Sequence, residues 1–329
     1  MVERLSSAQL ASQAAFGNIT SIFESVGHGE AVPIAVAERT VEELLTCLDE
    51  DSDALVSLIR LKSHGDYACM HSVAVCALMA CLSRRMGFNE KMRREAALAG
   101  LLHDIGKALI PSRVLAKPER LTDDEFAIVR NHPQHGFHAL DSTGGVAPAV
   151  KDVAHHHHER PDGRGYPYGL TGDRISMLAR MGAVCDVYDA ITSNRPYKNG
   201  WDPAAAIRAM VQWAEGGQFD AKVAAAFAAM MGTHPIGSLV RLRSERLAVV
   251  NAKLAGKASR ASVTAFYCIR SRQAVCPEII EVGMNASANG EAIIDLESNT
   301  RWRFRDLDKL WAGDFAQRTQ AAHIPSRVP

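Results

Sequence analysis

The sequence predicts a mainly α-helical protein with a small β-rich domain towards its C-terminus, and two observations support this prediction. Apolar residues recur at helical spacing from the N-terminus to about Gly232, in stretches separated by loops that contain Gly and Pro. After Pro235 the pattern changes to alternating and β-branched stretches separated by Gly, Asn and Ser clusters. We therefore expect an N-terminal helical segment at 1–60, a main helical domain at 61–235, a small β-rich domain at 236–315 and a tail at 316–329.

The composition of the chain excludes several classes of protein. Lys and Arg number 37, as do Asp and Glu, so no overall charge attracts a nucleic acid polymer or an anionic membrane. Seven cysteines without a C-x-x-C pair indicate free thiols in a reducing compartment, and we expect a cytoplasmic location. The N-terminus lacks the apolar core of a signal peptide, and the longest apolar run, 223–231, is shorter than the roughly 20 residues that span a bilayer.

The first helices offer little chemistry. Residues 1–60 are rich in Ala and have apolar positions at helical spacing, so we expect them to pack against the main domain or a partner in a homodimer. A helix beginning at Tyr67 is small and apolar almost all round, which predicts burial on most sides. His71 is its one strongly polar residue, and a lone buried His is more often a core residue than a ligand.

His103 and Asp104 follow an amphipathic helix predicted at 90–102, whose C-terminus Gly106 is expected to cap. Imidazole and carboxylate both bind divalent metals, but neighbouring helical residues point about 100° apart, so a shared cation would have to lie between helices. A bare His-Asp pair usually belongs to a helix end. Here, however, eight of the thirteen histidines lie between His103 and His158, a density that packing does not explain.

Two later segments supply further imidazoles. The capping box at 122–125 starts a helix that leads to His132. A run of four histidines at 155–158 precedes a loop with two glycines and two prolines, at 159–167. Such a run is often only a solvated tract, but a helix that ends in a Gly/Pro loop commonly presents ligands.

The helix predicted at 175–192 places Asp186 and Asp189 on one face among apolar neighbours. Two carboxylates in so apolar a helix are costly unless they are paired or bind metal. A basic and aromatic loop follows at 194–198, and two more helices are expected after N-capping residues Asp202 and Asp220.

Taken together and in this order, these segments resemble the HD-GYP family, a bacterial branch of the HD-domain metal-dependent phosphohydrolases. The similarity covers about half of the chain, from Tyr67 to Gly232. Because the family's His pair directly precedes Glu, the register selects His157 and His158 from the run of four. The matching segments are His71-Ser72, His103 to Lys107, Leu121-Thr122 leading to His132-Pro133, His157 to Glu159 with Asp162 to Pro167, Asp186 to Ala190, and Arg195 to Lys198.

The resemblance implies an HD-type helical bundle with a binuclear metal centre, in which Asp104 bridges two divalent ions, iron or manganese by preference. Members with a third metal carry Glu four residues before the first His, where this chain has Tyr67, so we expect two ions. Asp189 is expected to orient a His ligand or to cap buried groups. The implied ligands are His71, His103, Asp104, His132, His157, His158 and Asp186; the implied catalytic residues are Asp104 and Lys107; the implied substrate contacts are Lys107, Arg195, Lys198 and Tyr166.

The function that the resemblance implies is a cyclic di-GMP phosphodiesterase, in which a metal-bridged hydroxide opens the ring to give pGpG, GMP or both. A GGDEF-type or other signalling protein is an implied partner at the Gly-Tyr-Pro loop. Two alternatives stay open: a hydrolase of cyclic GMP-AMP or another nucleotide, and a catalytically silent cyclic-dinucleotide effector. Arg195 and Lys198 favour a large cyclic ligand, and the complete ligand set argues against a silent protein. For Lys107 the alternative is an exposed lysine at a helix end.

Overall fold

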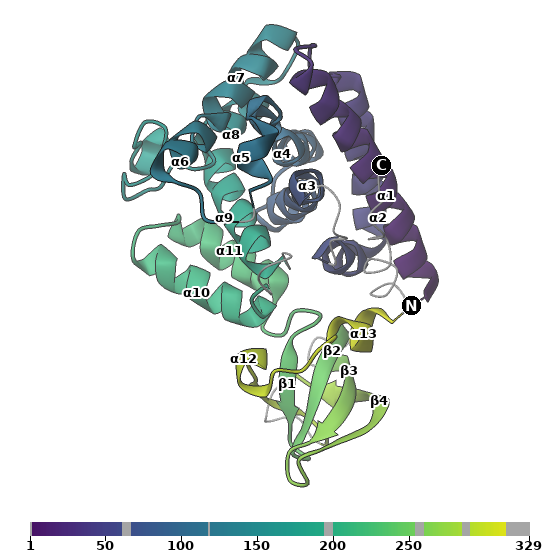
Figure 1. Ribbon diagram of the computed structural model, residues 1–329. Coiled ribbons are helices and arrows are strands. Elements are labelled where there is room, and N and C mark those ends of the chain that lie inside the picture. Colours follow the sequence, from purple (N-terminus) through teal and green to yellow (C-terminus); the bar gives the residue numbers. More distant parts are fainter. Residues whose placement is uncertain are drawn as a thin grey trace, which may run out of the picture. The chain divides into compact units, whose positions relative to one another are not determined.

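The structure is a computed structural model that describes residues 2–60, 67–117, 119–193, 200–253, 260–284 and 290–313. It divides into two compact units (Figure 1). The larger unit comprises residues 1–60, 66–191 and 209–230, and the regular elements of its described part are helices. The smaller unit comprises 61–65, 192–208 and 231–329, and contains an antiparallel sheet. The predicted fold class is therefore confirmed, whereas the domain boundaries at 60 and 235 stay predictions.

In the larger unit, helices α1 (Val2–Gly27) and α2 (Ile34–Arg60) pack on each other and on α3 (Tyr67–Arg85). Helix α3 is buried along most of its length, as its apolar sequence predicts. Helix α4 (Glu90–Leu102) runs against α3 so closely that a Cβ at Gly100 would lie 2.8 Å from the carbonyl oxygen of Val75. The close approach of α3 and α4 places the end of α4 near the middle of the unit.

The remaining helical elements include the helices predicted after Thr122, at 175–192, and after Asp202 and Asp220. The capping box is present, since Thr122 Oγ1 accepts from the Glu125 amide at 3.3 Å and Glu125 Oε2 accepts from the Thr122 amide at 2.8 Å. Asp202 and Asp220 cap the next-to-last and last of these helices. The elements are η1 (Ile105–Leu109), α5 (Ser112–Leu115), α6 (Asp123–Val129), α7 (His132–Thr143), α8 (Pro148–His156), η2 (Gly172–Arg174), α9 (Met177–Thr192), α10 (Pro203–Glu215) and α11 (Ala221–Met231).

The prediction that Gly106 caps α4 is wrong. Helix α4 is followed by His103 in a right-handed helical conformation, and Gly106 lies inside η1. A Cβ at Gly106 would lie only 2.0 Å from the carbonyl oxygen of His132 and 2.4 Å from the amide nitrogen of Gly136. Glycine is therefore required because the backbones of η1 and α7 touch, and this contact sets the distance between Asp104 and His132.

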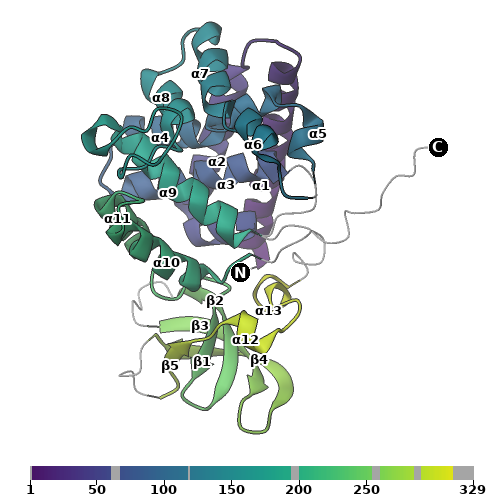
Figure 2. The same cartoon turned by 60° about the vertical axis from the view of Figure 1, so that its left-hand side comes forward.

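The smaller unit contains a five-stranded sheet with strand order β4-β3-β2-β1-β5, in which all pairs are antiparallel (Figure 2). Four of its strands were expected, within 238–243, 247–250, 262–267 and 291–296. Strand β4 (Gln273–Gly283) was not, because it lies at the edge of the sheet and most of its side chains are exposed. The strands and helices of this unit are β1 (Leu239–Leu242), β2 (Arg246–Lys253), β3 (Arg260–Cys268), β4, β5 (Ile293–Leu296), α12 (Asn299–Trp302) and α13 (Asp308–Ala312).

Among the described helices, none combines the length and the apolar character that crossing a membrane requires.

Candidate metal centre

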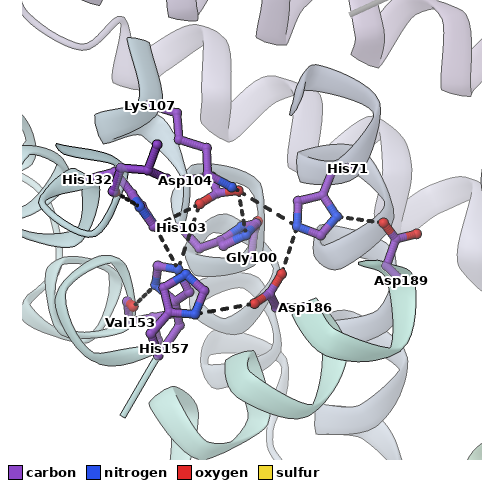
Figure 3. A network of polar contacts seen from close by, with 12 residues as sticks. His71, Gly100, His103, Asp104, Lys107, His132, Val153, His157, Asp186 and Asp189 are labelled. Atoms are coloured by element: carbon purple, nitrogen blue, oxygen red, sulfur yellow. Dashed lines mark hydrogen bonds and ion pairs between the residues drawn. The ribbon is translucent and has the colours of Figure 1, made fainter. Parts of the chain in front are cut away.

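The seven predicted ligands come from segments far apart in the sequence, and the helical unit brings them together (Figure 3). His71 lies on α3 and Asp186 on α9, while His103 and Asp104 connect α4 to η1. His132 begins α7, and the remaining two imidazoles follow the end of α8. Six of the seven residues are buried, with at most 7% of their surface exposed: His71, His103, Asp104, His132, His157 and Asp186.

Backbone carbonyl groups orient three of the imidazoles. Nδ1 of His103 lies 2.8 Å from Gly100 O, Nδ1 of His132 lies 2.7 Å from Val129 O, and Nδ1 of His157 lies 2.9 Å from Val153 O. A carbonyl oxygen can only accept, so each Nδ1 must carry the proton. In the neutral ring, Nε2 then presents a lone pair, which is the form that binds a metal ion.

These lone pairs point at one another and at a carboxylate. His132 Nε2 lies 3.1 Å from Asp104 Oδ1 and 3.3 Å from His157 Nε2. His103 Nε2 and Asp104 Oδ1 are buried and have no hydrogen-bond donor within the described part of the chain. Acceptors that face acceptors in a buried site are costly unless a cation lies between them. The donor set of imidazole and carboxylate suits a divalent metal of intermediate hardness.

Two groups of ligand atoms are close enough to hold an ion, and they share Asp104. One consists of Asp104, His132, His157 and His158; the other consists of His71, His103 and Asp104. Asp186 lies between them, with Oδ1 2.9 Å from His71 Nε2 and Oδ2 3.6 Å from His158 Nδ1. This is the arrangement expected if Asp104 bridges two cations.

Asp189 holds His71 in place, as expected of a residue that orients a ligand. Its Oδ2 lies 2.5 Å from His71 Nδ1, on the side of the ring opposite to Asp186 (Figure 3). Burial lowers the pKa of His71, but the bonds to Asp186 and Asp189 outweigh it and raise that pKa overall. Asp189 thus positions the His71 ring through Nδ1, while Asp186 lies beside Nε2.

The electrostatics of the cluster favour a charged carboxylate at Asp104 and neutral imidazoles at His157 and His158. Burial would raise the pKa of Asp104, but Lys107 and the neighbouring imidazoles hold it well below its usual range. Burial and the other imidazoles lower the pKa of His157 well below the usual value, and burial lowers that of His158 to about 3. Anionic oxygen and unprotonated nitrogen are the forms that coordinate cations.

Lys107 lies in η1, and its ammonium group contacts Asp104 Oδ2. The Lys107 side chain is 22% exposed, whereas that of Asp104 is buried. It is therefore placed beside the carboxylate rather than free at a helix end.

The Gly-Tyr-Pro loop is attached to the cluster through Tyr166 and Glu159. The Tyr166 ring stacks on His158 with a centroid distance of 4.6 Å. Glu159 is 1% exposed, and its carboxylate accepts the amides of Tyr168 at 2.7 Å and Leu170 at 2.9 Å. Glu159, whose role the sequence did not reveal, is thus a buried clamp for the loop.

The other predicted site residues divide into two sets. His155 contacts Tyr168 and His156 contacts Asp152, whereas His157 and His158 lie in a donor group with Asp104. Arg195, Lys198 and the side chain of Tyr67 lie outside what the structure describes, so their roles stay predictions. Arg130, whose guanidinium lies over the Tyr166 ring, was not singled out by any sequence motif.

The fold and the donor cluster define an HD domain, and the family model for the HD domain matches residues 52–223. The chain is 45% identical over 94% of its length to the cyclic di-GMP phosphodiesterase PA4108 of Pseudomonas aeruginosa, of which it covers 74%. With its ordered motifs, the chain belongs to the HD-GYP family, which confirms the resemblance.

Other relatives are covered less fully. The chain is 42% identical over 38% of its length to the cyclic di-GMP phosphodiesterase response regulator RpfG of Xanthomonas campestris, of which it covers 34%. It is 31% identical over 61% of its length to the 3'3'-cGAMP-specific phosphodiesterase 1 of Vibrio cholerae, of which it covers 45%. A solved structure of Bd1817, described as an HDG"Y"P protein from Bdellovibrio bacteriovorus, has a TM-score of 0.57 at 17% identity, covering 68% of this chain and 71% of that one. This last similarity concerns the fold.

Proposed function

We propose that this protein is a metal-dependent phosphodiesterase that hydrolyses cyclic di-GMP to pGpG, GMP or both. The observation that carries the proposal is that the Nε2 lone pairs of buried imidazoles face Asp104 Oδ1. This buried oxygen has no hydrogen-bond donor among the described residues. The substrate is supported by the 45% identical relative, which is named as a cyclic di-GMP phosphodiesterase. Relatives named as acting on 3'3'-cGAMP make the hydrolysis of cyclic GMP-AMP the second candidate.

Two ions are proposed because the two donor groups share Asp104, and iron or manganese because imidazole and carboxylate suit both. When bound, such ions supply Lewis acidity that activates water and neutralises phosphoryl oxygens. The chain contributes the positions of the donors. Asp104 belongs to both donor groups. In His103, His132 and His157 a backbone carbonyl accepts a hydrogen bond from Nδ1, which leaves Nε2 for the metal.

Lys107 is proposed to donate to an oxygen of the reacting phosphate, since its ammonium is held beside Asp104 at the edge of the cluster. Arg195 and Lys198 are proposed to contact the rest of the ligand. Seven free thiols support a cytoplasmic location. A GGDEF-type partner at the loop 162–167 and a homodimer through residues 1–60 are also proposed.

The test combines metal analysis with turnover. Protein purified without oxygen should contain about two iron or manganese ions per chain and should hydrolyse cyclic di-GMP. His103→Ala and Asp104→Ala should lose metal and activity while the circular dichroism spectrum keeps its helical shape. His156→Ala removes an imidazole that contacts Asp152 outside the cluster, and serves as the matched control.

Retention of full metal content in both His103→Ala and Asp104→Ala would contradict the site. Bound metal without turnover of any cyclic dinucleotide would instead favour a silent effector. Turnover of 3'3'-cGAMP with no turnover of cyclic di-GMP would favour the second candidate.

A further inference from the structure

Arg130 forms the outer layer of a stack that begins at a candidate ligand. It follows α6 and precedes His132 by two residues. Its Cζ lies 4.6 Å from the centroid of the Tyr166 ring, and the His158 ring stacks on Tyr166 at a centroid distance of 4.6 Å and an interplanar angle of 26°. Arg130 and His158 therefore both contact the Tyr166 ring.

This stack leaves the hydrogen-bond donors of Arg130 available. A guanidinium group that stacks through its planar face keeps its five N–H groups in the plane, pointing away from the ring. Arg130 is exposed, and no carboxylate lies within ion-pair distance of it among the described residues. In contrast to Arg130, two other cationic side chains each contact a carboxylate. Lys107 contacts Asp104, and Arg160 contacts Asp162 at 2.6 Å.

The position of Arg130 also couples it to the cluster. Tyr166 stacks on His158, which belongs to the donor group of Asp104, and the Arg130 guanidinium lies over the same Tyr166 ring. A ligand that extends from the cluster past His158 would reach the edge of this guanidinium.

We propose that Arg130 binds the second phosphate of a cyclic dinucleotide, the one that is not held at the metal cluster. This inference rests on the proposed function and adds a residue that determines substrate size. A planar fork of N–H donors matches two phosphate oxygens, and stacking on Tyr166 limits the freedom that binding must remove. In this arrangement Tyr166 supports the Arg130 guanidinium on the side chain of a candidate ligand, His158.

The test compares a substrate with two phosphates and a substrate with one. In Arg130→Gln, KM for cyclic di-GMP should rise by about tenfold to a hundredfold, the effect of one charge-assisted pair. KM for bis-p-nitrophenyl phosphate should change by less than about twofold, because that substrate has no second phosphate, and metal content should stay the same. Arg130→Lys should recover part of the loss, since it restores the charge without the fork.

Arg164→Gln is the matched control, since it removes one exposed cation from the same loop as Tyr166 and should leave both KM values unchanged. A titration with a hydrolysis-resistant phosphorothioate analogue of cyclic di-GMP gives a readout besides turnover, and its Kd should rise in Arg130→Gln by the same factor. Cyclic di-AMP, which shares the phosphates and lacks guanine, should lose affinity equally.

Four outcomes would overturn the inference. They are an unchanged Kd in Arg130→Gln, an equal loss in Arg164→Gln, an equal loss for the small substrate, and a loss confined to the guanine nucleotide, which would assign Arg130 to the base. If the wild-type protein binds no cyclic di-GMP, the proposed function fails, and the inference fails with it. Normal wild-type binding with an unaffected Arg130→Gln rejects the inference alone.

Discussion

Replacement of Gly106 by Ala should remove one metal ion per chain without unfolding the protein. The new Cβ would lie 2.0 Å from His132 O, whereas ordinary contact begins near 3.4 Å, so η1 and α7 must separate by about 1.4 Å. His103 and Asp104 precede η1 and stay with α4, while His132 moves with α7. Metal–donor distances tolerate only about 0.2 Å. The group that contains His132 should therefore fail, and the group of His71, His103 and Asp104 should persist.

The cost in stability is that of overpacking, about 1–3 kcal/mol in the free energy of unfolding. Elemental analysis of anaerobically purified protein measures the ion count, and urea denaturation measures the stability. Gly17→Ala is the matched control, because Gly17 lies in α1 with no heavy atom within 4 Å of its built Cβ. That change should be neutral or stabilise by about 0.5–1 kcal/mol, with two ions retained. A Gly106→Ala protein with two ions and unchanged stability would refute the role given to this contact.

Three further changes test other parts of the helical unit. Glu159→Ala should lower the free energy of unfolding by about 1–3 kcal/mol, because two amides lose their acceptor, and protease cleavage of the loop should accelerate. Asp189→Asn should weaken metal binding by about tenfold to a hundredfold in a chelator competition, because His71 loses its anionic partner. Asp49→Asn should destabilise the protein by at most about 1 kcal/mol at pH 7, because Asp49 pairs with the buried Arg93 at 2.7 Å but is itself half exposed.

The effect of Asp49→Asn should depend on pH in one direction. The hydrogen bond from Arg93 lowers the pKa of Asp49, so the carboxylate stabilises the fold above the pKa of the unfolded chain and loses this effect as the pH falls through the folded pKa. Denaturation curves of the wild type and variant should therefore converge in acid. A difference that grows below pH 4 would contradict this sign. A rate of protease cleavage unchanged in Glu159→Ala would contradict the role given to Glu159. A metal affinity unchanged in Asp189→Asn would contradict the role given to Asp189.

Much of the candidate site was predictable from the order of the motifs. His71 alone looked like a core residue, and only its place before His103-Asp104 made it a ligand candidate. The register also separated His157 and His158 from His155 and His156, and the structure places the two pairs in different surroundings. Asp186 and Asp189 were predicted to share a face of α9, but their separate tasks were not predicted, because these depend on the position of α3.

Other features required the tertiary structure because they arise from contacts between distant segments. The sequence predicts that Gly106 caps a helix, because a sequence does not distinguish a capping glycine from one that lets two backbones touch. Strand β4 was missed because exposed edge residues weaken the alternation that marks a strand. Arg130 is one of many surface arginines until the loop brings Tyr166 beneath it.

The amino-acid sequence alone defines the chemistry available to this protein, because side-chain type decides which groups can bind a divalent cation and motif order identifies the family. The tertiary structure decided how these groups are used. Which imidazole nitrogen carries a proton depends on carbonyl groups of the local helices, and which acceptors face each other depends on helix packing. These features depend on distances of a few ångströms between residues that lie tens of positions apart in the chain. A sequence pattern does not contain those distances.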